Sequence, residues 1–248
     1  MNFTILQFDS LPSTNTEALV HAKRGAAEGL CIIARQQTAG RGRQGRTWVS
    51  ENDSGLYFSI VLRPKIEMRF LPLITLMTGV AVHDTLAEFG LRPDIKWVND
   101  LHVNGKKISG ILAETTDTGK GLAVIVGIGI NIKNSSFPPE IAGTATSIES
   151  ETGHTVTIKD LAEGLTRFIS FFYGVLNDND GHAAIIKEWQ RRSSYFSGKN
   201  VRVTFGNETI TGTTDGLESN GALRILTEDG DFKIIQAGDV EQLRQITD

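Results

Sequence analysis

The sequence predicts an α/β (α+β) protein with a large N-terminal domain, built on a mixed β-sheet with flanking helices, and a small C-terminal β-domain. Three observations support this fold class. Strand-like and helical segments alternate over 3–90. Three strand-like segments then follow with only turn signals between them. From about Lys199 the pattern changes to short alternating strands separated by Asn-Gly and Asp-Gly turns, which suits a small barrel. We place the boundary near 196–199 and expect domains over 1–196 and 197–248.

The first elements are a strand over 3–9 and a helix that starts at Ser13 or Thr14 and ends at Gly25. Glu17 follows Thr14 by three residues, as in a capping box. Two more strands follow, a continuously apolar one in "GLCIIARQQ" and one in "SGLYFSIVLRP" that ends at a proline. The segment "LPLITLMTGVAVHDTLAEFG" is a helix with apolar residues at helical spacing.

The next three strand-like segments, 94–103, 106–116 and 121–132, indicate a meander of hairpins. A loop rich in serine, proline and glycine covers 134–147. Two helices are expected after it, at about 158–177 and 181–194.

Composition limits the classes of function. The chain of 248 residues has 25 basic and 29 acidic residues, so its net charge of -4 does not attract polyanions to the protein as a whole. The single cysteine, Cys31, lies in an apolar run and excludes an internal disulfide framework. We find no signal peptide and no apolar run that could span a membrane, so we expect a cytoplasmic protein without a membrane partner.

The stretch "QTAGRGRQGRTW", 37–48, places three arginines and three glycines within seven residues. It satisfies G-x-G-x-x-G, but a strand follows it where a dinucleotide fold requires a helix, so we reject that fold. Glycines that expose backbone N–H groups and arginines with forked donors suit an anion site. A solvated basic loop explains this stretch, taken alone, equally well.

Two further segments carry polar residues or glycines within apolar strands. Lys96, Asn99 and Asp100 precede a turn and a lysine pair, Lys106 and Lys107. In "VIVGIGINI" two glycines and an asparagine interrupt a core strand. A glycine in a strand marks either close approach by a ligand or backbone, or a bulge or tight packing.

With these segments side by side, the sequence resembles the biotin protein ligases, such as biotin–[acetyl-CoA-carboxylase] ligase. The matching pieces are "STN" (13–15), "QTAGRGRQGRTW" (37–48), "KWVNDLHVNGKKISGILAE" (96–114) and "GIGINI" (127–132). One departure is Val98, where the family usually has proline, and we expect a subtle backbone change there. The resemblance implies a class II synthetase-like catalytic domain and an SH3-like C-terminal barrel.

The resemblance implies a reaction in two steps. Biotin and ATP give biotinyl-5'-AMP and pyrophosphate, and a lysine of a biotin carboxyl carrier protein domain then attacks the activated acyl group. The first step needs cationic charge and orientation, and no base, because the attacking carboxylate is already ionised.

The catalytic residues implied by the resemblance are Lys107, Arg43 and Asp100. Lys107 would hold the biotin carboxylate and the α-phosphate together; without the resemblance it would be a solvated hairpin lysine, as we expect of Lys106. Asp100 would bind Mg²⁺, orient the carrier amine or deprotonate it, and these roles stay open.

The binding residues follow by the same resemblance. Biotin is assigned to Ser13, Thr14, Asn15, Gln37, Gly40, Arg41, Gly42, Arg43, Lys107 and Gly110, with Ile108, Ile111 and Leu112 as apolar wall. ATP is assigned to Arg41, Arg43, Arg46, Trp48, Lys96, Asn99, Asp100 and Asn131. For Thr14, helix capping is the competing explanation.

Three further expectations concern alternatives and partners. A lipoate protein ligase shares the general fold and reaction, and a non-catalytic biotin or nucleotide sensor would use the same pocket. Some members of this family carry an N-terminal helix-turn-helix domain. The first strand begins at Phe3 here, so we expect an enzyme only, with no DNA as a partner. The resemblance also implies a homodimer formed through strands of the catalytic domain.

Overall fold

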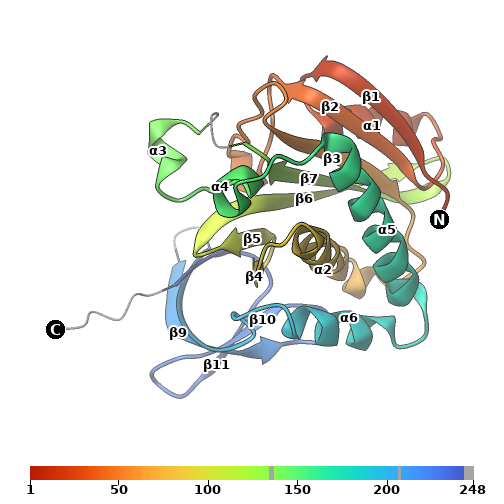
Figure 1. Cartoon of the computed structure of the whole chain (residues 1–248). Helices are drawn as coiled ribbons and strands as arrows, with labels where there is room; N and C mark the ends of the chain where they lie inside the picture. The colour runs from red at the N-terminus through yellow and green to blue at the C-terminus, as the bar shows by residue number, and fades with distance from the viewer. Residues whose placement is uncertain (134–136, 206–207, 243–248) are drawn as a thin grey trace.

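The computed structural model describes residues 1–133, 137–205 and 208–242 of the chain (Figure 1). Its large sheet has seven strands in the order β1-β2-β3-β7-β6-β5-β4. Their bounds are β1 Thr4–Leu11, β2 Leu30–Gln37, β3 Gly55–Leu62, β4 Asp94–Lys96, β5 Asp100–Val103, β6 Lys106–Thr118 and β7 Gly121–Asn131. β1 and β2 are parallel and the other neighbours are antiparallel, so the predicted mixed sheet is confirmed.

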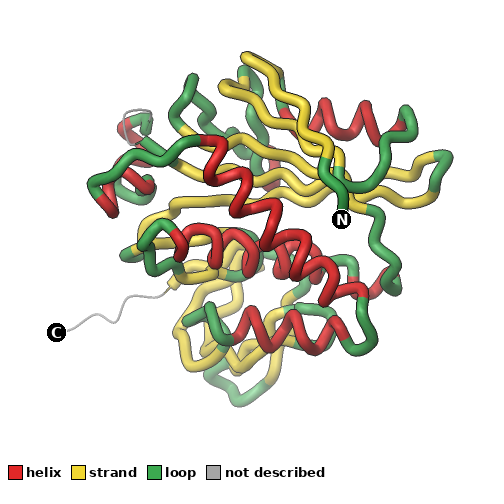
Figure 2. Tube along the Cα trace, turned by 45° about the vertical axis from the view of Figure 1, so that its right-hand side comes forward, coloured by secondary structure: helices red, strands yellow, loops and turns green. Residues whose placement is uncertain are grey.

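Helices cover both faces of this sheet. α1, Thr14–Lys23, connects β1 to β2 and packs on β3 and β7, while α2, Leu73–Glu88, and α5, Ile158–Asn177, pack on the opposite side. In Figure 2 the long helix α5 runs diagonally in front of the sheet. Every residue of β3 is buried, as expected of an apolar strand that is covered on both faces.

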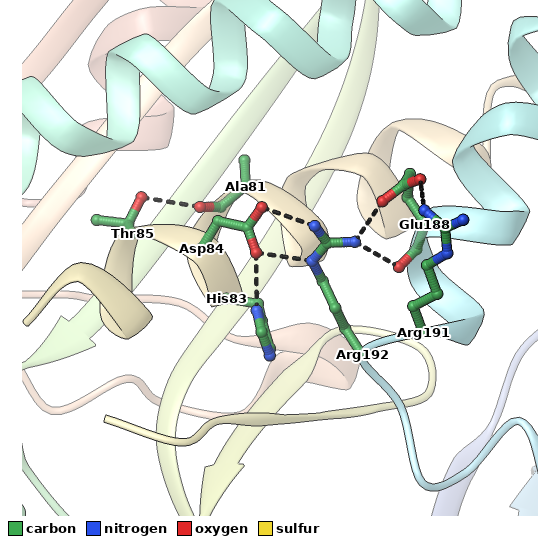
Figure 3. Close-up of polar contacts among 7 residues, drawn as sticks. All are labelled: Ala81, His83, Asp84, Thr85, Glu188, Arg191 and Arg192. Atoms are coloured by element: carbon green, nitrogen blue, oxygen red, sulfur yellow. Dashed lines mark hydrogen bonds and ion pairs between the residues drawn. The ribbon is translucent and has the colours of Figure 1, made fainter. Parts of the chain in front are cut away.

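A charged cluster joins α2 to α6, Gly181–Gln190. Arg192, just after α6, donates two hydrogen bonds to the Asp84 carboxylate, at 2.7 and 2.8 Å, and a third to Glu188 Oε2 at 2.6 Å (Figure 3). The backbone carbonyl of Arg192 also accepts a hydrogen bond from Ile95 N on β4. The predicted helix over 181–194 therefore ends earlier, because the chain after Gln190 turns to bond with β4 and α2.

Two expectations for the N-terminal region are corrected. The segment 94–103 is two strands, because the chain turns between Lys96 and Asp100, and the Trp97–Val98 peptide bond there is cis. The turn buries the Trp97 ring and lets its Nε1 donate to Gly221 O at 3.0 Å. The capping box is absent: Ser13 is the N-cap of α1 and makes no side-chain cap bond, while the Thr14 hydroxyl bonds elsewhere.

Shorter elements complete this part of the chain. Two 3₁₀ turns are η1, Arg43–Gly45, and η2, Met68–Phe70, and two short helices are α3, Pro139–Ala142, and α4, Ile148–Thr152. The Thr157 hydroxyl caps α5 by accepting from Asp160 N at 3.0 Å. Within the described residues, no helix has the length and apolarity that crossing a membrane would require.

The C-terminal sheet is antiparallel, in the order β11-β10-β9-β8-β12, and lies beneath the large sheet in Figure 1. Its strands are β8 Ser197–Phe205, β9 Glu208–Leu217, β10 Leu223–Leu226, β11 Phe232–Ile235 and β12 Asp239–Gln242. This confirms the predicted small β-domain. We propose the boundary between the domains 1–196 and 197–248 at Ser197, because the chain enters β8 there.

Candidate functional site

A cavity lies where the start of α1, strands β6 and β7, and the arginine loop (residues 37–48) meet. At the α1 end it is lined by the predicted biotin residues Ser13, Thr14, Asn15 and Gln37, and by Arg41, which donates to Thr16 on α1. At the other end it is lined by the predicted residues Gly42, Arg43, Arg46, Trp48, Asn99, Asp100 and Lys107, and by Gly110, which lies beside Trp48 and Lys107. Segments that are far apart in the sequence thus share one cavity.

The floor of the cavity consists of glycines on β6 and β7. A Cβ at Gly127 would lie 2.2 Å from Asn15 Oδ1, and a Cβ at Gly129 would lie 2.4 Å from Trp48 Cε2. Gly110, the cross-strand partner of Gly129, also lies under Trp48. Of the two explanations for glycines in these strands, tight packing is therefore the correct one for Gly127 and Gly129, because the side chains of Asn15 and Trp48 lie directly against them.

Buried polar side chains are linked by hydrogen bonds at the α1 end. Gln37 Oε1 accepts from Thr14 N at 2.8 Å, and Gln37 Nε2 donates to Ser50 Oγ at 2.8 Å. Asn15 Nδ2 donates to Glu114 Oε2 at 2.8 Å. This cluster fixes several hydrogen-bonding groups beside apolar strands, as recognition of a small polar head group requires.

Each arginine of the arginine loop has a partner across the cavity. Arg41 donates two hydrogen bonds to Glu114, at 2.9 and 2.8 Å, and Arg43 Nη1 donates to Asn99 Oδ1 at 3.0 Å. Arg46 pairs with Asp239 of the C-terminal sheet. These contacts hold the loop over the cavity without using all the donors that the guanidinium groups carry.

Lys107 lies at the centre of the cationic end. Its Nζ lies 2.6 Å from Asp100 Oδ1 and 5.5 Å from the centre of the Trp48 ring. Lys107 is half-buried, whereas Lys106 is exposed, as predicted. A half-buried ammonium beside a cavity can bind anionic ligands.

Four predicted residues lie outside this lining: Gly40, Lys96, Asn131, and Ile108, which was expected in the apolar wall but is fully buried in the core. Asn131 lines a second cavity, which shares Thr47, Trp48 and Lys107 with the first and is the larger, about 270 Å³ against about 130 Å³. Lys96 is half-buried and pairs with Asp100 across β4 and β5; burial lowers the pKa of its ammonium group. Gly40 is buried within the arginine loop, where a Cβ would meet Trp48 O at 2.4 Å.

Several residues at the site were not predicted from the sequence, including Glu114, Ser50, Ser59 and Asp239. Glu114 lies within the segment 96–114, but nothing in the spacing of the sequence indicated its ion pair with Arg41. Asp239 lies on a different domain. A serine within the apolar strand β3 was the one available signal for Ser59, which hydrogen-bonds Asn15.

The site contains few metal-binding groups. Within the described residues, no group of three or more His, Cys, Asp or Glu side chains could hold a metal ion. Asp100 and Asp239 are the carboxylates that line the cavity. Because Mg²⁺ is commonly held by one or two carboxylates together with substrate phosphates, this set fits a cation that arrives with a phosphate ligand.

Comparisons with known proteins agree with this geometry. The model of the biotin/lipoate A/B protein ligase family matches residues 7–131, and that of the biotin protein ligase C terminal domain matches residues 196–242. A bifunctional ligase/repressor BirA from Bacillus spizizenii is 36% identical over 94% of this chain and 72% of its own length. A biotin–[acetyl-CoA-carboxylase] ligase from Paracoccus denitrificans is 33% identical over 92% of this chain and 96% of its own.

Solved structures show the same similarity over the whole chain. The biotin protein ligase from Aquifex aeolicus in complex with biotin and ATP superposes with a TM-score of 0.84 at 30% identity. The match covers 97% of this chain and 99% of that one.

Proposed function

The chain belongs to the biotin/lipoate A/B protein ligase family, and from this premise we propose that it is a biotin protein ligase. It activates biotin with ATP to biotinyl-5'-AMP and transfers the biotinyl group to a lysine of a biotin carboxyl carrier protein. The observation that supports this proposal most directly is the cavity itself. It has a cluster of hydrogen-bonded polar side chains at one end and the half-buried Lys107 at its cationic end.

Biotin is the substrate better suited to the polar end. Its ureido ring carries two N–H donors and a carbonyl acceptor, whereas the dithiolane of lipoate has neither. Thr14 and Asn15 are buried and Gln37 is half-buried, and Gln37 Oε1 accepts from Thr14 N there. A ureido ring can hydrogen-bond to these groups, whereas a dithiolane cannot. The match to a biotin protein ligase C terminal domain supports the same choice.

In the first step the biotin carboxylate attacks the α-phosphorus of ATP. We assign Lys107 to hold both anions, because it lines both cavities. Arg43 adds forked donors on one side, held in place by Asn99. The larger second cavity, with Asn131 on its wall, suits the nucleoside of ATP.

Mg²⁺ enters this proposal only with ATP. Asp100 and Asp239 fit a cation that is held mainly by phosphate oxygens, as described above. When bound, Mg²⁺ would neutralise charge on the triphosphate. The residues of this chain orient the phosphates through Arg43, Arg46 and Lys107.

In the second step the ε-amine of a carrier lysine attacks the acyl carbon of biotinyl-5'-AMP, forming an amide and releasing AMP. Asp100 lies beside Lys107 and carries the carboxylate nearest to it, so we assign Asp100 to orient or deprotonate the incoming amine. The arginine loop would exclude water from the reactive mixed anhydride during this step.

Partners and assembly are also part of the proposal. β5 pairs with β6 only as far as Gly110, so in the described sheet the later half of β6 has no strand on that side. We propose a homodimer that uses this edge, which sedimentation at several concentrations would test.

Because the net charge is -4, we propose no binding to operator DNA, and because the reaction consumes ATP, we place it in the cytoplasm.

The direct test of activation is biotin-dependent exchange between ATP and pyrophosphate. Biotin should stimulate this exchange and lipoate should not. Exchange with lipoate alone would favour a lipoate ligase, and tight biotin binding without any exchange would favour a non-catalytic sensor.

A further inference from the structure

Ser59 and Gly127 are direct cross-strand partners in the antiparallel pair of β3 and β7, which are neighbours at the centre of the sheet (Figure 1). Both face the start of α1, where Asn15 packs against them. A Cβ at Gly127 would lie 2.2 Å from Asn15 Oδ1, so only glycine leaves room for the amide. Together the two residues form a niche for Asn15 beneath the polar end of the cavity.

The hydrogen bonds of this niche have determined directions. Asn15 Nδ2 donates to Leu112 O at 3.2 Å and to Glu114 Oε2 at 2.8 Å, so its Oδ1 faces Ser59 as an acceptor. Ser59 Oγ lies 2.6 Å from this oxygen and gives it the one hydroxyl proton that a serine carries.

The use of the Ser59 proton determines the direction of the hydrogen bond that Thr14 makes. Its Oγ1 lies 2.8 Å from Ser59 Oγ and 3.1 Å from Gln37 Oε1. Because the Ser59 proton is used for Asn15, the 2.8 Å contact between the two hydroxyl oxygens is a hydrogen bond in which Thr14 Oγ1 donates to Ser59 Oγ. Thr14 Oγ1 then offers only lone pairs to the cavity, and it can accept a hydrogen bond from a ligand N–H group.

We infer that Ser59, with Gly127 opposite it, is a positioning residue that selects a ligand with a ureido N–H at this end of the cavity. The inference rests on the proposed biotin ligase function. Ser59 is fully buried, and Thr14 and Asn15 are 4% and 3% exposed, so water does not replace a lost hydroxyl freely. Ser59 acts through Thr14 and Asn15 and does not line the cavity itself.

The test compares Ser59→Ala with the wild-type protein by titration calorimetry without ATP. Three ligands are used: biotin, desthiobiotin, and biotin methylated on a ureido nitrogen. Ser59→Ala should reduce the preference for biotin over the methylated analogue about fivefold, the size of one net hydrogen bond. The preference for biotin over desthiobiotin and the affinity for ATP should not change, because neither depends on the ureido N–H.

Two further variants keep the test decisive. Thr85→Val on α2 is the matched control for a lost buried hydroxyl, because Thr85 Oγ1 donates to Ala81 O at 2.8 Å (Figure 3). Neither residue lines the cavity. This variant should leave all ratios unchanged. In an Asn15→Ala background, Ser59→Ala should have little further effect, because the two residues act in one chain of hydrogen bonds.

The outcomes separate this inference from the proposed function. A wild-type protein that does not bind biotin contradicts the proposed function. Biotin binding with an unchanged ligand preference in Ser59→Ala contradicts only the role of Ser59. Equal losses in Ser59→Ala and Thr85→Val would assign the effect to general loss of packing and would also overturn the inference.

Discussion

Lys107 Nζ on β6 lies 2.6 Å from Asp100 Oδ1 on β5, at the point where the register between these strands shifts. Both residues line the first cavity, and Lys107 also lines the second. Without substrates, Asp100 partly neutralises the lysine. A biotin carboxylate and an α-phosphate would compete with Asp100 for the ammonium group, so this pair organises the proposed first step.

Replacement of Lys107 tests its assigned role. Lys107→Met should lower the rate of biotin-dependent ATP–pyrophosphate exchange by about 10² to 10³, the effect of removing one preorganised group that stabilises the transition state. Lys106→Met is the matched control, because Lys106 is exposed and does not line the cavity. Equal effects of the two substitutions would contradict the assignment.

Replacement of Asp100 separates the two steps. Asp100→Ala should slow transfer from preformed biotinyl-5'-AMP to a carrier domain by about 10² if Asp100 is the base or orienting group for the amine. Adenylate formation and transfer are to be measured in separate single-turnover reactions. Lost adenylation with unchanged transfer would exclude that role and leave Asp100 with ATP and Mg²⁺.

The arginine loop should respond to substrates. Arg41, Arg43 and Arg46 supply trypsin sites, and Gln44 and Gly45 between them have φ values of 54° and 73°. At ten times the dissociation constants of biotin and ATP, cleavage in this loop should fall about tenfold, because only the closed form binds both. Cleavage after Lys120, in an exposed turn between β6 and β7, serves as the control. Unchanged cleavage in the loop would contradict closure.

His102 should make stability depend on pH. Burial, with a smaller contribution from Lys96, lowers the pKa of His102 to about 4. Between this pH and the unfolded pKa of about 6.5, the unfolded chain binds the additional proton, so stability falls as pH decreases through this window. The free energy of unfolding should be about 2 kcal/mol lower at pH 5 than at pH 7.5 through this group alone.

Urea unfolding of the wild-type protein and His102→Gln at both pH values measures this contribution. The carboxylates Asp94 and Asp100, and the ammonium groups of Lys96 and Lys107, also influence His102 and are present in both proteins. The variant should therefore show a smaller decrease. Identical pH dependence in the two proteins would contradict the assignment to His102.

Local sequence patterns predicted most of the fold. The apolar run of β3 and the helical spacing of α2 are properties of neighbouring residues, so their elements could be identified. The turn between Lys96 and Asp100 could not, because it depends on Trp97 reaching Gly221 of the other domain. The end of α6 likewise depends on Arg192 bonding to Asp84 on α2.

Site residues could be predicted from the sequence where they lie within a motif of the family. Lys107, Asp100 and Arg43 were found through the family resemblance, and the structure brings them to one cavity. Glu114 and Asp239 were not predicted, because they form their ion pairs with the arginine loop only through contacts across the fold. Thr14 had two explanations from sequence, and the helix cap is wrong because Ser13 is the N-cap of α1, while the Thr14 side chain bonds with Gln37 and Ser59.

Mass spectrometry of a carrier domain after incubation with this protein, biotin, ATP and Mg²⁺ tests the central claim most directly. A biotin protein ligase should add one biotinyl group to one lysine of the carrier, and the product should require both biotin and ATP. Lipoate in place of biotin should leave the carrier unmodified. An unmodified carrier with biotin, under conditions in which a known biotin ligase modifies it, would contradict the proposed function.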